Sequence, residues 1–250
     1  MVLLCLFLPV SSIANDAILT WISELEDGVY QVNVQRMINN EWQPVEAVYS
    51  SKELNYSPTI GSNKLGDIMV VWTSRSTVRS IGRAILFHEG KWQKNEVIAN
   101  QGGQVTTPAI VFDQSNNAHI VWVSDHNGLD DVFYQTWIAK RNEWTKPELV
   151  NQSNKVPDIL PNVSLDLTGD VLVQWQSISL ETNNYAQLSR VFETTKPASG
   201  ESNNDDLRQL SFSDITMPKD WKGSIGSAVI HFPNNYLLRQ EKLPQYISNP

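Results

Sequence analysis

The stretch PAIVFDQSNNAHIVW, Pro108 to Trp122, decides the fold prediction for the 250-residue chain. A β-branched run leads into the turn-forming residues Gln114 to Asn117, and a second such run ends on the tryptophan. This pattern predicts two antiparallel strands joined by a tight turn. The outline returns as PTIGSNKLGDIMVVW (Pro58 to Trp72) and PNVSLDLTGDVLVQW (Pro161 to Trp175), and each Trp lies 14 residues after its Pro.

Two series of tryptophans extend this repeat over most of the chain. The first series has spacings of 51, 50 and 53 residues, and the second follows it by 21, 20 and 22 residues. The members are Trp21, Trp72, Trp122 and Trp175 in the first series, and Trp42, Trp92 and Trp144 in the second. A spacing that holds in two registers indicates an internal repeat. We interpret the first series as core residues between repeats, the alternative being aromatic platforms for sugars.

One repeat divides into four predicted strands, best seen at Thr107–Phe112, Ala118–Ser124, Val132–Ile138 and Glu143–Val150. Pro147 cannot donate a ladder hydrogen bond, so the fourth strand should lie at a sheet edge. Repeats of this kind predict an all-β protein, a β-propeller of four-stranded antiparallel blades with four or five repeats of about 50 residues. We place the repeats near residues 18–56, 57–106, 107–159 and 160–213 of a single domain that spans 15–250.

The first repeat lacks its opening strand, and the end of the chain offers a substitute. Ala228-Val229-Ile230 resembles the missing strand, after a polar stretch at 194–207 that predicts a long exposed loop. We therefore expect the segment 214–250 to return and complete the first blade, which would remove free sheet edges. The alternatives are a degenerate fifth blade and an open arc that pairs with another chain.

The N-terminus predicts export. Val2–Val10 is an apolar run too short to span a bilayer, and Ser12 and Ala14 are small residues at the −3 and −1 positions of a cleavage site before Asn15. Residues 1–14 are thus predicted to be a cleaved signal peptide, with a secreted or periplasmic mature protein that has no membrane span. No Lys or Arg precedes the run, so a buried strand or an uncleaved anchor is the alternative.

Charge and cysteine content exclude several functions. The formal net charge of −8 disfavours binding to nucleic acid or to an anionic membrane. The single cysteine, Cys5, lies inside the predicted signal peptide, so the mature chain would have neither a disulfide nor a cysteine nucleophile.

The repeats resemble those of bacterial sialidase-like (BNR-type) β-propellers over roughly residues 18–190. The shared pattern is Pro-x-Ile/Val, an Asp five residues after the Pro, a Gly or Asn turn, and a strand that ends in Trp. It is carried by Pro108, Ile110, Asp113, Asn117 and Trp122, by Pro161, Val163, Asp166, Gly169 and Trp175, and by Pro58, Ile60, Gly66 and Trp72. The resemblance implies the fold and leaves the activity open, because propellers serve many functions.

This sequence departs from the catalytic members of that family. The full Ser-x-Asp-x-Gly-x-Thr-Trp signature and the Arg-Ile-Pro motif are absent, and Asn63 replaces the aspartate in one copy. Sialidases clamp a carboxylate with three arginines and use a Tyr/Glu nucleophile pair, but none of the eight arginines here lies in such a context. With no intact catalytic motif, we favour a protein that is not an enzyme.

The candidate ligand-binding residues lie in loops that a four-stranded meander would bring to one face. They are Arg75, Arg79, Arg83, Asp125, Asn127, Asp130 and Asp131. The arginines would form an anion pocket, or else be separate solvated side chains. The acidic loop offers oxygen ligands that suit Ca²⁺, although its spacing does not match an EF-hand and a structural turn is the alternative. No other cofactor or metal is predicted.

The function that we predict is recognition of a glycan or a protein partner through this polar loop face. The alternatives are a sialidase-like glycoside hydrolase, whose arginine loop would hold an acidic sugar, and a structural subunit of an envelope assembly. Asp113 and Asp166 are expected to cap their turns, and His119 to be packed.

Overall fold

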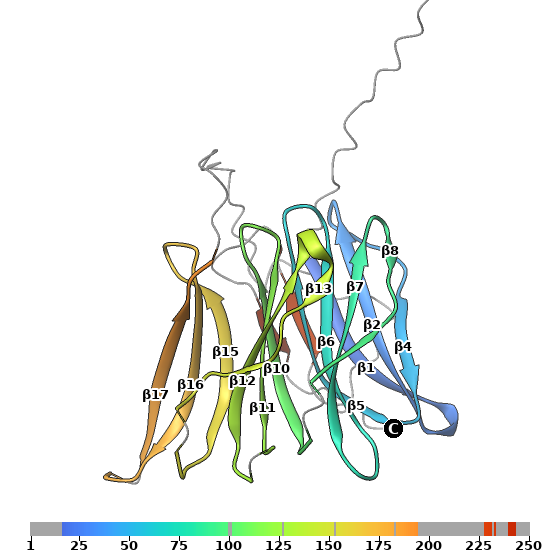
Figure 1. Ribbon diagram of the computed structural model, residues 1–250. Coiled ribbons are helices and arrows are strands. Elements are labelled where there is room, and N and C mark those ends of the chain that lie inside the picture. The colour runs from blue at the N-terminus through green and yellow to red at the C-terminus, as the bar shows by residue number, and fades with distance from the viewer. Residues whose placement is uncertain are drawn as a thin grey trace, which may run out of the picture.

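The computed structural model describes residues 17–99, 102–126, 128–152, 154–182, 184–194, 228–231, 233 and 240–243. Four antiparallel sheets stand side by side, with the 3₁₀ helices η1 (Glu26–Gly28) and η2 (Ala139–Arg141) in their connections (Figure 1). The all-β prediction is confirmed. The predicted signal peptide 1–14, Asn127 and residues 195–207 of the predicted loop lie outside the described residues.

The N-terminal half of the repeat array forms two sheets. The first sheet contains β19 (Gln240–Leu243), β18 (Ala228–His231), β1 (Ala17–Leu25), β2 (Val29–Ile38) and β3 (Glu41–Trp42) in spatial order, with β4 (Glu46–Ser51) also paired to β2. The second contains β5 (Leu54–Ser62), β6 (Ile68–Arg75), β7 (Ser80–His88) and β8 (Lys91–Trp92), with β9 (Glu96–Ala99) also paired to β7.

The next two repeats form the third and fourth sheets. The third contains β10 (Val105–Phe112), β11 (Ala118–Ser124), β12 (Asp131–Ile138) and β13 (Glu143–Trp144), with β14 (Glu148–Leu149) also paired to β12. The fourth contains β15 (Asp158–Leu165), β16 (Val171–Ser179) and β17 (Asn184–Phe192). The predicted fourth strand of the third sheet is two separate short edge pieces, β13 and β14, and the second sheet has the same break between β8 and β9 without a proline there.

The repeated proline and tryptophan face each other across a β-bulge. The pairing of β10 with β11 skips Thr107 and Pro108, so these two residues together oppose Trp122. The same shift recurs between β5 and β6 and between β15 and β16. The residue before each proline has a left-handed backbone conformation: φ is 49° at Ser57, 47° at Thr107 and 52° at Leu160. The constant Pro–Trp spacing is therefore a strand register fixed by a bulge.

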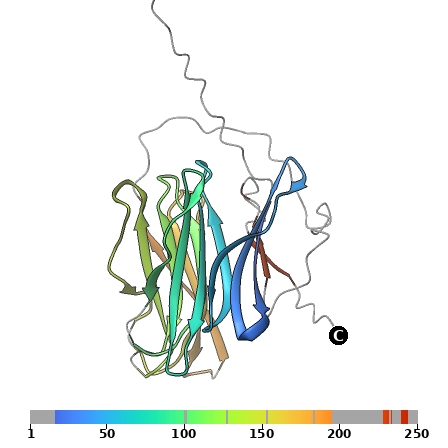
Figure 2. The same cartoon turned by 90° about the vertical axis from the view of Figure 1, so that its right-hand side faces the viewer.

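The C-terminal strand completes the first sheet. β18 pairs antiparallel with β1, and Ile230 lies opposite Leu19. Figure 2 shows β18 and β19 beside β1. Val229 belongs to the apolar cluster between the first two sheets, so β18 supplies core residues as well as backbone hydrogen bonds. The similarity between Ala228-Val229-Ile230 and the missing strand thus corresponds to a real pairing.

Each seam between neighbouring sheets is filled by one apolar cluster. Trp72 packs between the first and second sheets, Trp122 between the second and third, and Trp175 between the third and fourth. Their exposed fractions are 0%, 1% and 6%, which confirms that these three lie in the core between repeats. At about 25 cal/mol per Å², burial of these indoles is a large part of the stabilisation of the seams. Trp21, the first member of the series, is also buried, but it packs within the first sheet.

The four sheets form an open arc in the described part of the chain. No apolar cluster of described residues joins the fourth sheet to the first, and these two sheets lie at opposite sides of Figure 1. On β16, Gln174 and Gln176 occupy the face that is apolar in the second and third sheets, where Val71 and Val121 lie. A polar outer face is typical of a terminal repeat. Among the described residues, no helix has the length and hydropathy needed to cross a membrane.

Candidate functional site

The loops predicted to share one face do lie at one end of the sheets, at the bottom of Figure 1. We call this end the loop face; it carries the β6–β7, β11–β12 and β16–β17 hairpins and the links between sheets. The side-chain oxygen Oε1 of Gln104, in one link, accepts hydrogen bonds from the Ser80 amide (3.0 Å) and hydroxyl (2.9 Å). In the next link, the Asp158 amide donates to the Asp130 carbonyl at 2.7 Å. Links and hairpins thus hold each other in place.

An open hollow of about 600 Å³ lies on the loop face between the first and second sheets. Its walls come from the start of β2, from the β4–β5 link and from the β6–β7 hairpin. The lining residues are Tyr30, Lys52, Glu53, Leu54, Arg75, Ser76 and Thr77. The hollow thus combines a phenol ring, two cations, one carboxylate and two aliphatic hydroxyl groups, the functional groups that recognise a polar ligand.

The structure places the three candidate arginines in three different environments. Arg83 points into the seam, where it pairs with Glu53 at 3.0 Å, donates to the Ser74 hydroxyl at 3.0 Å and lies 5.3 Å from the Tyr49 ring centre. Arg75 is exposed and lines the hollow. Arg79 is exposed in the β6–β7 hairpin outside the hollow lining, and within the described residues neither exposed arginine has an ion pair. Only Arg75 is therefore available to a ligand in the hollow.

The acidic candidates lie together in the β11–β12 loop of the third sheet. The Asp125 carboxylate accepts a hydrogen bond from the Gln104 amide, and Asp131 accepts one from Asn151 at 2.8 Å. Burial raises the pKa of Asp130, with further contributions from the charges of Asp125 and Asp131. In the described part of the chain, no three His, Cys, Asp or Glu residues converge as a metal site would require. The Asp125 and Asp131 carboxylates thus hold the loop against the neighbouring links through these hydrogen bonds.

A buried polar network anchors the base of that loop. Asn151 donates both to Asp131 and to Asp158, at 2.8 and 2.9 Å, and Asp158 in turn accepts the indole N–H of Trp175 at 2.8 Å. In the second sheet, Trp72 donates to Ser74 and Ser74 to Asn55, at 3.1 and 2.6 Å. These bonds connect Trp72 and Trp175 to the loop face and rigidify it.

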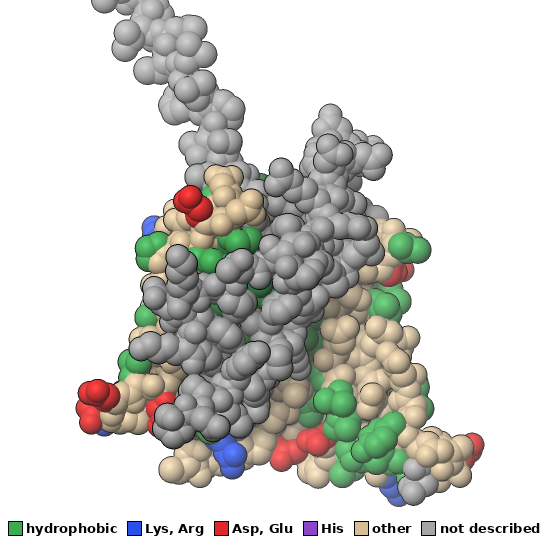
Figure 3. All heavy atoms as spheres, turned by 180° about the vertical axis from the view of Figure 1, so that it is seen from behind, with side chains coloured by type: hydrophobic (Ala, Val, Ile, Leu, Met, Phe, Trp, Pro, Cys, Tyr) green, Lys and Arg blue, Asp and Glu red, His purple; other side chains and the backbone are tan. Residues whose placement is uncertain are grey.

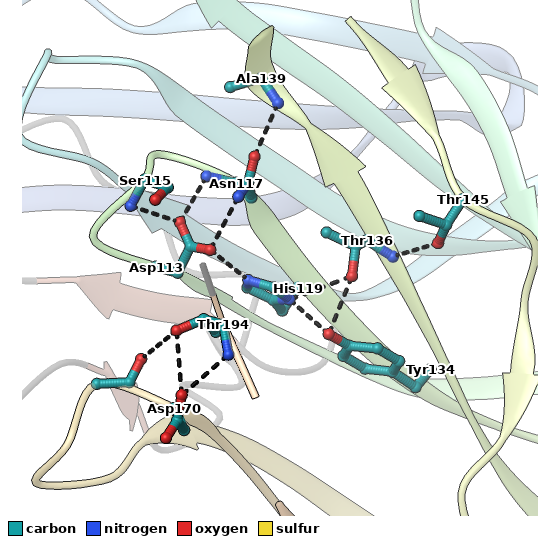
Figure 4. A network of polar contacts seen from close by, with 11 residues as sticks. Asp113, Ser115, Asn117, His119, Tyr134, Thr136, Ala139, Thr145, Asp170 and Thr194 are labelled. Atoms are coloured by element: carbon teal, nitrogen blue, oxygen red, sulfur yellow. Dashed lines mark hydrogen bonds and ion pairs between the residues drawn. The ribbon is translucent and has the colours of Figure 1, made fainter. Parts of the chain in front are cut away.

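At the opposite end, the turn aspartates act as predicted. Asp113 Oδ1 accepts the backbone amides of Ser115 and Asn117, both at 2.8 Å (Figure 4). Asp166 Oδ1 likewise accepts amides from Thr168 and Asp170, at 2.8 and 3.0 Å. The hydrogen bond from the Thr168 hydroxyl lowers the pKa of Asp166. The capping interpretation is confirmed for both residues.

A buried chain of side chains extends from Asp113 into the seam between the third and fourth sheets (Figure 4). His119 Nε2 lies 3.1 Å from Asp113 Oδ2, and Nδ1 lies 2.6 Å from the Tyr134 hydroxyl. Because a carboxylate only accepts, Nε2 carries the proton and Nδ1 accepts from Tyr134, which itself accepts from Thr136 at 2.9 Å. His119 is thus packed, as predicted.

The surroundings of this chain shift two pKa values. Burial tends to raise the pKa of Asp113, but hydrogen bonds from His119 and Asn117 outweigh it and leave the pKa below its usual value. Burial raises the pKa of Tyr134 to about 12. The Tyr134 ring is stacked on Phe192, with 4.1 Å between ring centres, which covers the chain from the fourth sheet. A buried network with satisfied hydrogen bonds is typical of a structural element.

Sequence comparisons identify no relative, whereas solved structures with similar folds exist. No family profile matches the chain, and no curated protein is significantly similar to it in sequence. An endo-arabinase from Bacteroides thetaiotaomicron is 10% identical with a TM-score of 0.43, and the match covers 96% of this chain and 82% of that one. A fucose lectin from Kordia zhangzhouensis, solved with methyl-fucoside, is 14% identical with a TM-score of 0.37, covering 56% and 99%.

The NanB sialidase from Streptococcus pneumoniae is 8% identical with a TM-score of 0.43, over 70% of this chain and 28% of that one. An endo-arabinase, a sialidase and a lectin are thus among the similar structures, but no family profile supports the BNR-type repeat. Identities and TM-scores this low carry no information about activity or substrate.

Sequence reasoning found Arg75 but missed the polar residues that the other walls of the hollow contribute. Tyr30, Lys52 and Glu53 lie at a strand start and in a link between sheets, where no motif marks them. A signal did exist for Arg83. It alternates with Ile85 and Phe87 along one strand, and such alternation places all three side chains on one face, toward the core.

Proposed function

We propose that this chain is an exported, propeller-type protein of four blades that binds a glycan through the hollow on its loop face. The observation that supports this proposal is the open hollow of about 600 Å³ in which Lys52 and Arg75 are exposed beside Tyr30. An aromatic ring with nearby hydroxyl groups suits a sugar ring, since its face packs on C–H groups while polar side chains bond hydroxyls. Two exposed cations favour a sugar that carries a carboxylate.

Binding rather than hydrolysis is favoured by the carboxylates. Glycoside hydrolysis commonly requires two carboxyl groups on either side of the scissile bond. Glu53 is the one carboxylate among the described lining residues, and its partner is Arg83 at 3.0 Å. Because this ion pair holds Glu53, we assign it to positioning the hollow wall.

A glycan-array screen of the chain from Asn15 onward tests the proposal, once in Ca²⁺ and once in chelator. We expect saturable binding to carboxylated glycans that does not depend on Ca²⁺. Binding that chelator abolishes would point to the acidic β11–β12 loop instead. A blank array from a protein with a folded β-sheet spectrum would contradict glycan binding altogether.

The fourth sheet supports a second candidate function, that of an assembling subunit. In each of the other three sheets further strands pair beyond the third strand of the repeat, whereas no described strand pairs with the outer edge of the nine-residue β17. Tyr185, Leu188 and Val191 on β17 are 61%, 42% and 51% exposed. Hydrophobic side chains gather at the lower right of Figure 3, on the side of the fourth sheet. A long exposed edge is a site for strand addition.

The sequence of β17 favours a second copy of the chain as its partner. An antiparallel pairing of two β17 strands centred on Leu188 would set Tyr185 opposite Val191 and Ala186 opposite Arg190, with no like charges opposed. We expect a dimer by light scattering, and Leu188→Lys should dissociate it because two cations would then meet at the centre. Gln187→Lys is the matched control. A monomer at all concentrations would eliminate this candidate.

A further inference from the structure

The three seams between sheets share one arrangement of side chains but differ at one place in it. In the first two seams, a glutamate on the edge strand of one sheet accepts a hydrogen bond from a tryptophan of the next sheet, and in the third seam a glutamate occupies the same strand position. The glutamates are Glu46, Glu96 and Glu148, opposite Val34, Ala84 and Tyr134 on their own sheets. The three seams differ in what fills the space beside the glutamate.

In the first seam an arginine fills this space. Arg36 pairs with Glu46 at 2.7 Å, and its guanidinium carbon lies 4.6 Å from the ring centre of Phe87 in the second sheet. Trp92 completes the group by donating its indole N–H to Glu46 at 2.8 Å. The guanidinium is therefore held between a carboxylate and an aromatic face, an ion pair combined with a cation–π contact.

In the third seam a tyrosine fills the space. Tyr134 stands at the position of Val34, and its ring stacks on Phe192, the counterpart of Phe87. Phe192 also receives a cation, since the guanidinium carbon of Arg190 lies 4.4 Å from its ring centre. Both outer seams are thus closed by the protein's own side chains.

The middle seam keeps the glutamate and the aromatic residue but lacks the filling side chain. Leu86 stands where the first seam has Arg36, and Ala84 where the third has Tyr134. A hollow of about 170 Å³ results, lined among others by these two residues and by Glu96, Trp137 and Trp144. This volume far exceeds the roughly 10–15 Å³ that a single water requires.

The components that hold Arg36 in the first seam are all present around this hollow. Trp144 donates its indole N–H to Glu96, as Trp92 does to Glu46. Trp137 occupies the place of Phe87, since both pair with the second-series tryptophan of their sheet. Tryptophan is the better partner for a cation–π contact.

We propose that the hollow between the second and third sheets binds a guanidinium group, such as the arginine side chain of a peptide. The guanidinium pairs with Glu96 and lies on the Trp137 ring, as Arg36 pairs with Glu46 and lies on Phe87. This site is separate from the loop-face hollow. It lies where β13 approaches β7, at the end of the sheets away from the loop face (Figure 1).

Lys94 is the competing cation, because it also lines the hollow. Within the described residues it forms no ion pair with Glu96. An ammonium group lacks the planar fork of a guanidinium and is more strongly hydrated, so it is the weaker partner for this site.

The test is a titration of the ¹⁵N-labelled protein with N-acetyl-arginine amide, with N-acetyl-citrulline amide as the neutral isostere. The readout is the indole N–H resonance of Trp144, assigned with Trp144→Phe. We expect a saturable shift with the arginine compound and none with the citrulline compound. Equal affinity for both compounds, or no saturable shift with either, would overturn the proposal.

Two variants locate the site. Glu96→Gln keeps an acceptor for Trp144 but removes the charge, and should weaken binding by about tenfold or more. Leu86→Arg rebuilds the first seam and should abolish binding by filling the hollow, whereas Leu86→Met should retain it. Lys94→Met should leave affinity unchanged or raise it. Wild-type affinity in Glu96→Gln would refute the site even if Leu86→Arg fails to fold.

Discussion

Trp92 donates its indole N–H to Glu46 across 2.8 Å, from the second sheet to the edge strand of the first. Trp144 makes the same bond to Glu96 one repeat later. Trp92 and Trp144 therefore connect the second and third sheets to the sheet before each, while Trp72, Trp122 and Trp175 fill the seams. A tryptophan is thus needed at both positions of the repeat, one to fill the seam and one to donate the hydrogen bond, although only the first series is deeply buried.

The hydrogen bond between Trp92 and Glu46 predicts that removing the indole nitrogen alone lowers the free energy of unfolding. Trp92→Phe retains an aromatic ring against Phe87 but leaves Glu46 with Arg36 as its remaining partner. A hydrogen bond to a charged group contributes about 1.5–3 kcal/mol, so we expect urea denaturation to show a loss of that size. Glu46→Gln, which keeps an acceptor, should cost less than Glu46→Ala. Equal losses for the two Glu46 variants would refute the bond's contribution.

The left-handed conformation of Thr107 in the β-bulge predicts that glycine at this position will stabilise the protein. Thr107 has φ of 47, and its buried hydroxyl has no hydrogen-bond partner among the described residues. Thr107→Gly removes both penalties, whereas glycine ordinarily costs about 0.5–1 kcal/mol in a strand. We expect a gain of about 1 kcal/mol in the free energy of unfolding. The neighbouring Thr106→Gly serves as control and should destabilise; similar effects of the two variants would argue against the left-handed bulge.

The core tryptophans should respond differently to loss of their indole nitrogens. Trp72 donates to Ser74 at 3.1 Å, whereas the buried nitrogen of Trp122 has no partner in the described part of the chain. Ser124 stands where the second sheet has Ser74, but its hydroxyl donates to the Gly102 carbonyl. The Ser74 hydroxyl donates instead to Asn55, whose place Val105 takes in the third sheet. Trp72→Phe should therefore cost about 1 kcal/mol more than Trp122→Phe in thermal or urea unfolding. The reverse order would contradict these assignments.

The raised pKa of Tyr134 predicts that the free energy of unfolding depends on pH in the alkaline range. Its pKa is about 12 in the folded protein against an ordinary value of 10.0, so its contribution to stability is complete below pH 10. Between pH 10 and about 12 the unfolded chain releases the proton and the folded chain keeps it, which lowers the free energy of unfolding. Tyr134→Phe should be less stable below pH 10, and this deficit should shrink toward pH 12. A deficit that is constant over this range would refute the shift.

Much of the fold was predictable because its signals are local. The Pro–Trp register, the edge position of the chain around Pro147 and the turn caps at Asp113 and Asp166 each depend on residues within about one repeat. The pairing of β18 with β1 was also predictable, since Ala228-Val229-Ile230 is apolar and β-branched like the strand it replaces.

The site was less predictable, because it depends on how separate repeats face each other. Glu46 and Glu96 look like ordinary charged residues of an edge strand, and only the packing of the next sheet reveals their tryptophan partners. Lys52 and Glu53 lie in a link without a motif, and they meet Arg75 only because the β6–β7 hairpin folds beside that link. Local sequence patterns contain no information about such contacts.

The most direct test of loop-face binding compares Arg75→Ala with Arg79→Ala on the glycan that binds best in the array screen. Both arginines are exposed in the same strand–hairpin segment, but only Arg75 lines the hollow. By isothermal titration calorimetry, we expect Arg75→Ala to weaken binding by about tenfold or more, since a charge-assisted hydrogen bond is lost, and Arg79→Ala to bind like the wild type. Equal affinities for the two variants would place the ligand outside the hollow and contradict the proposed function.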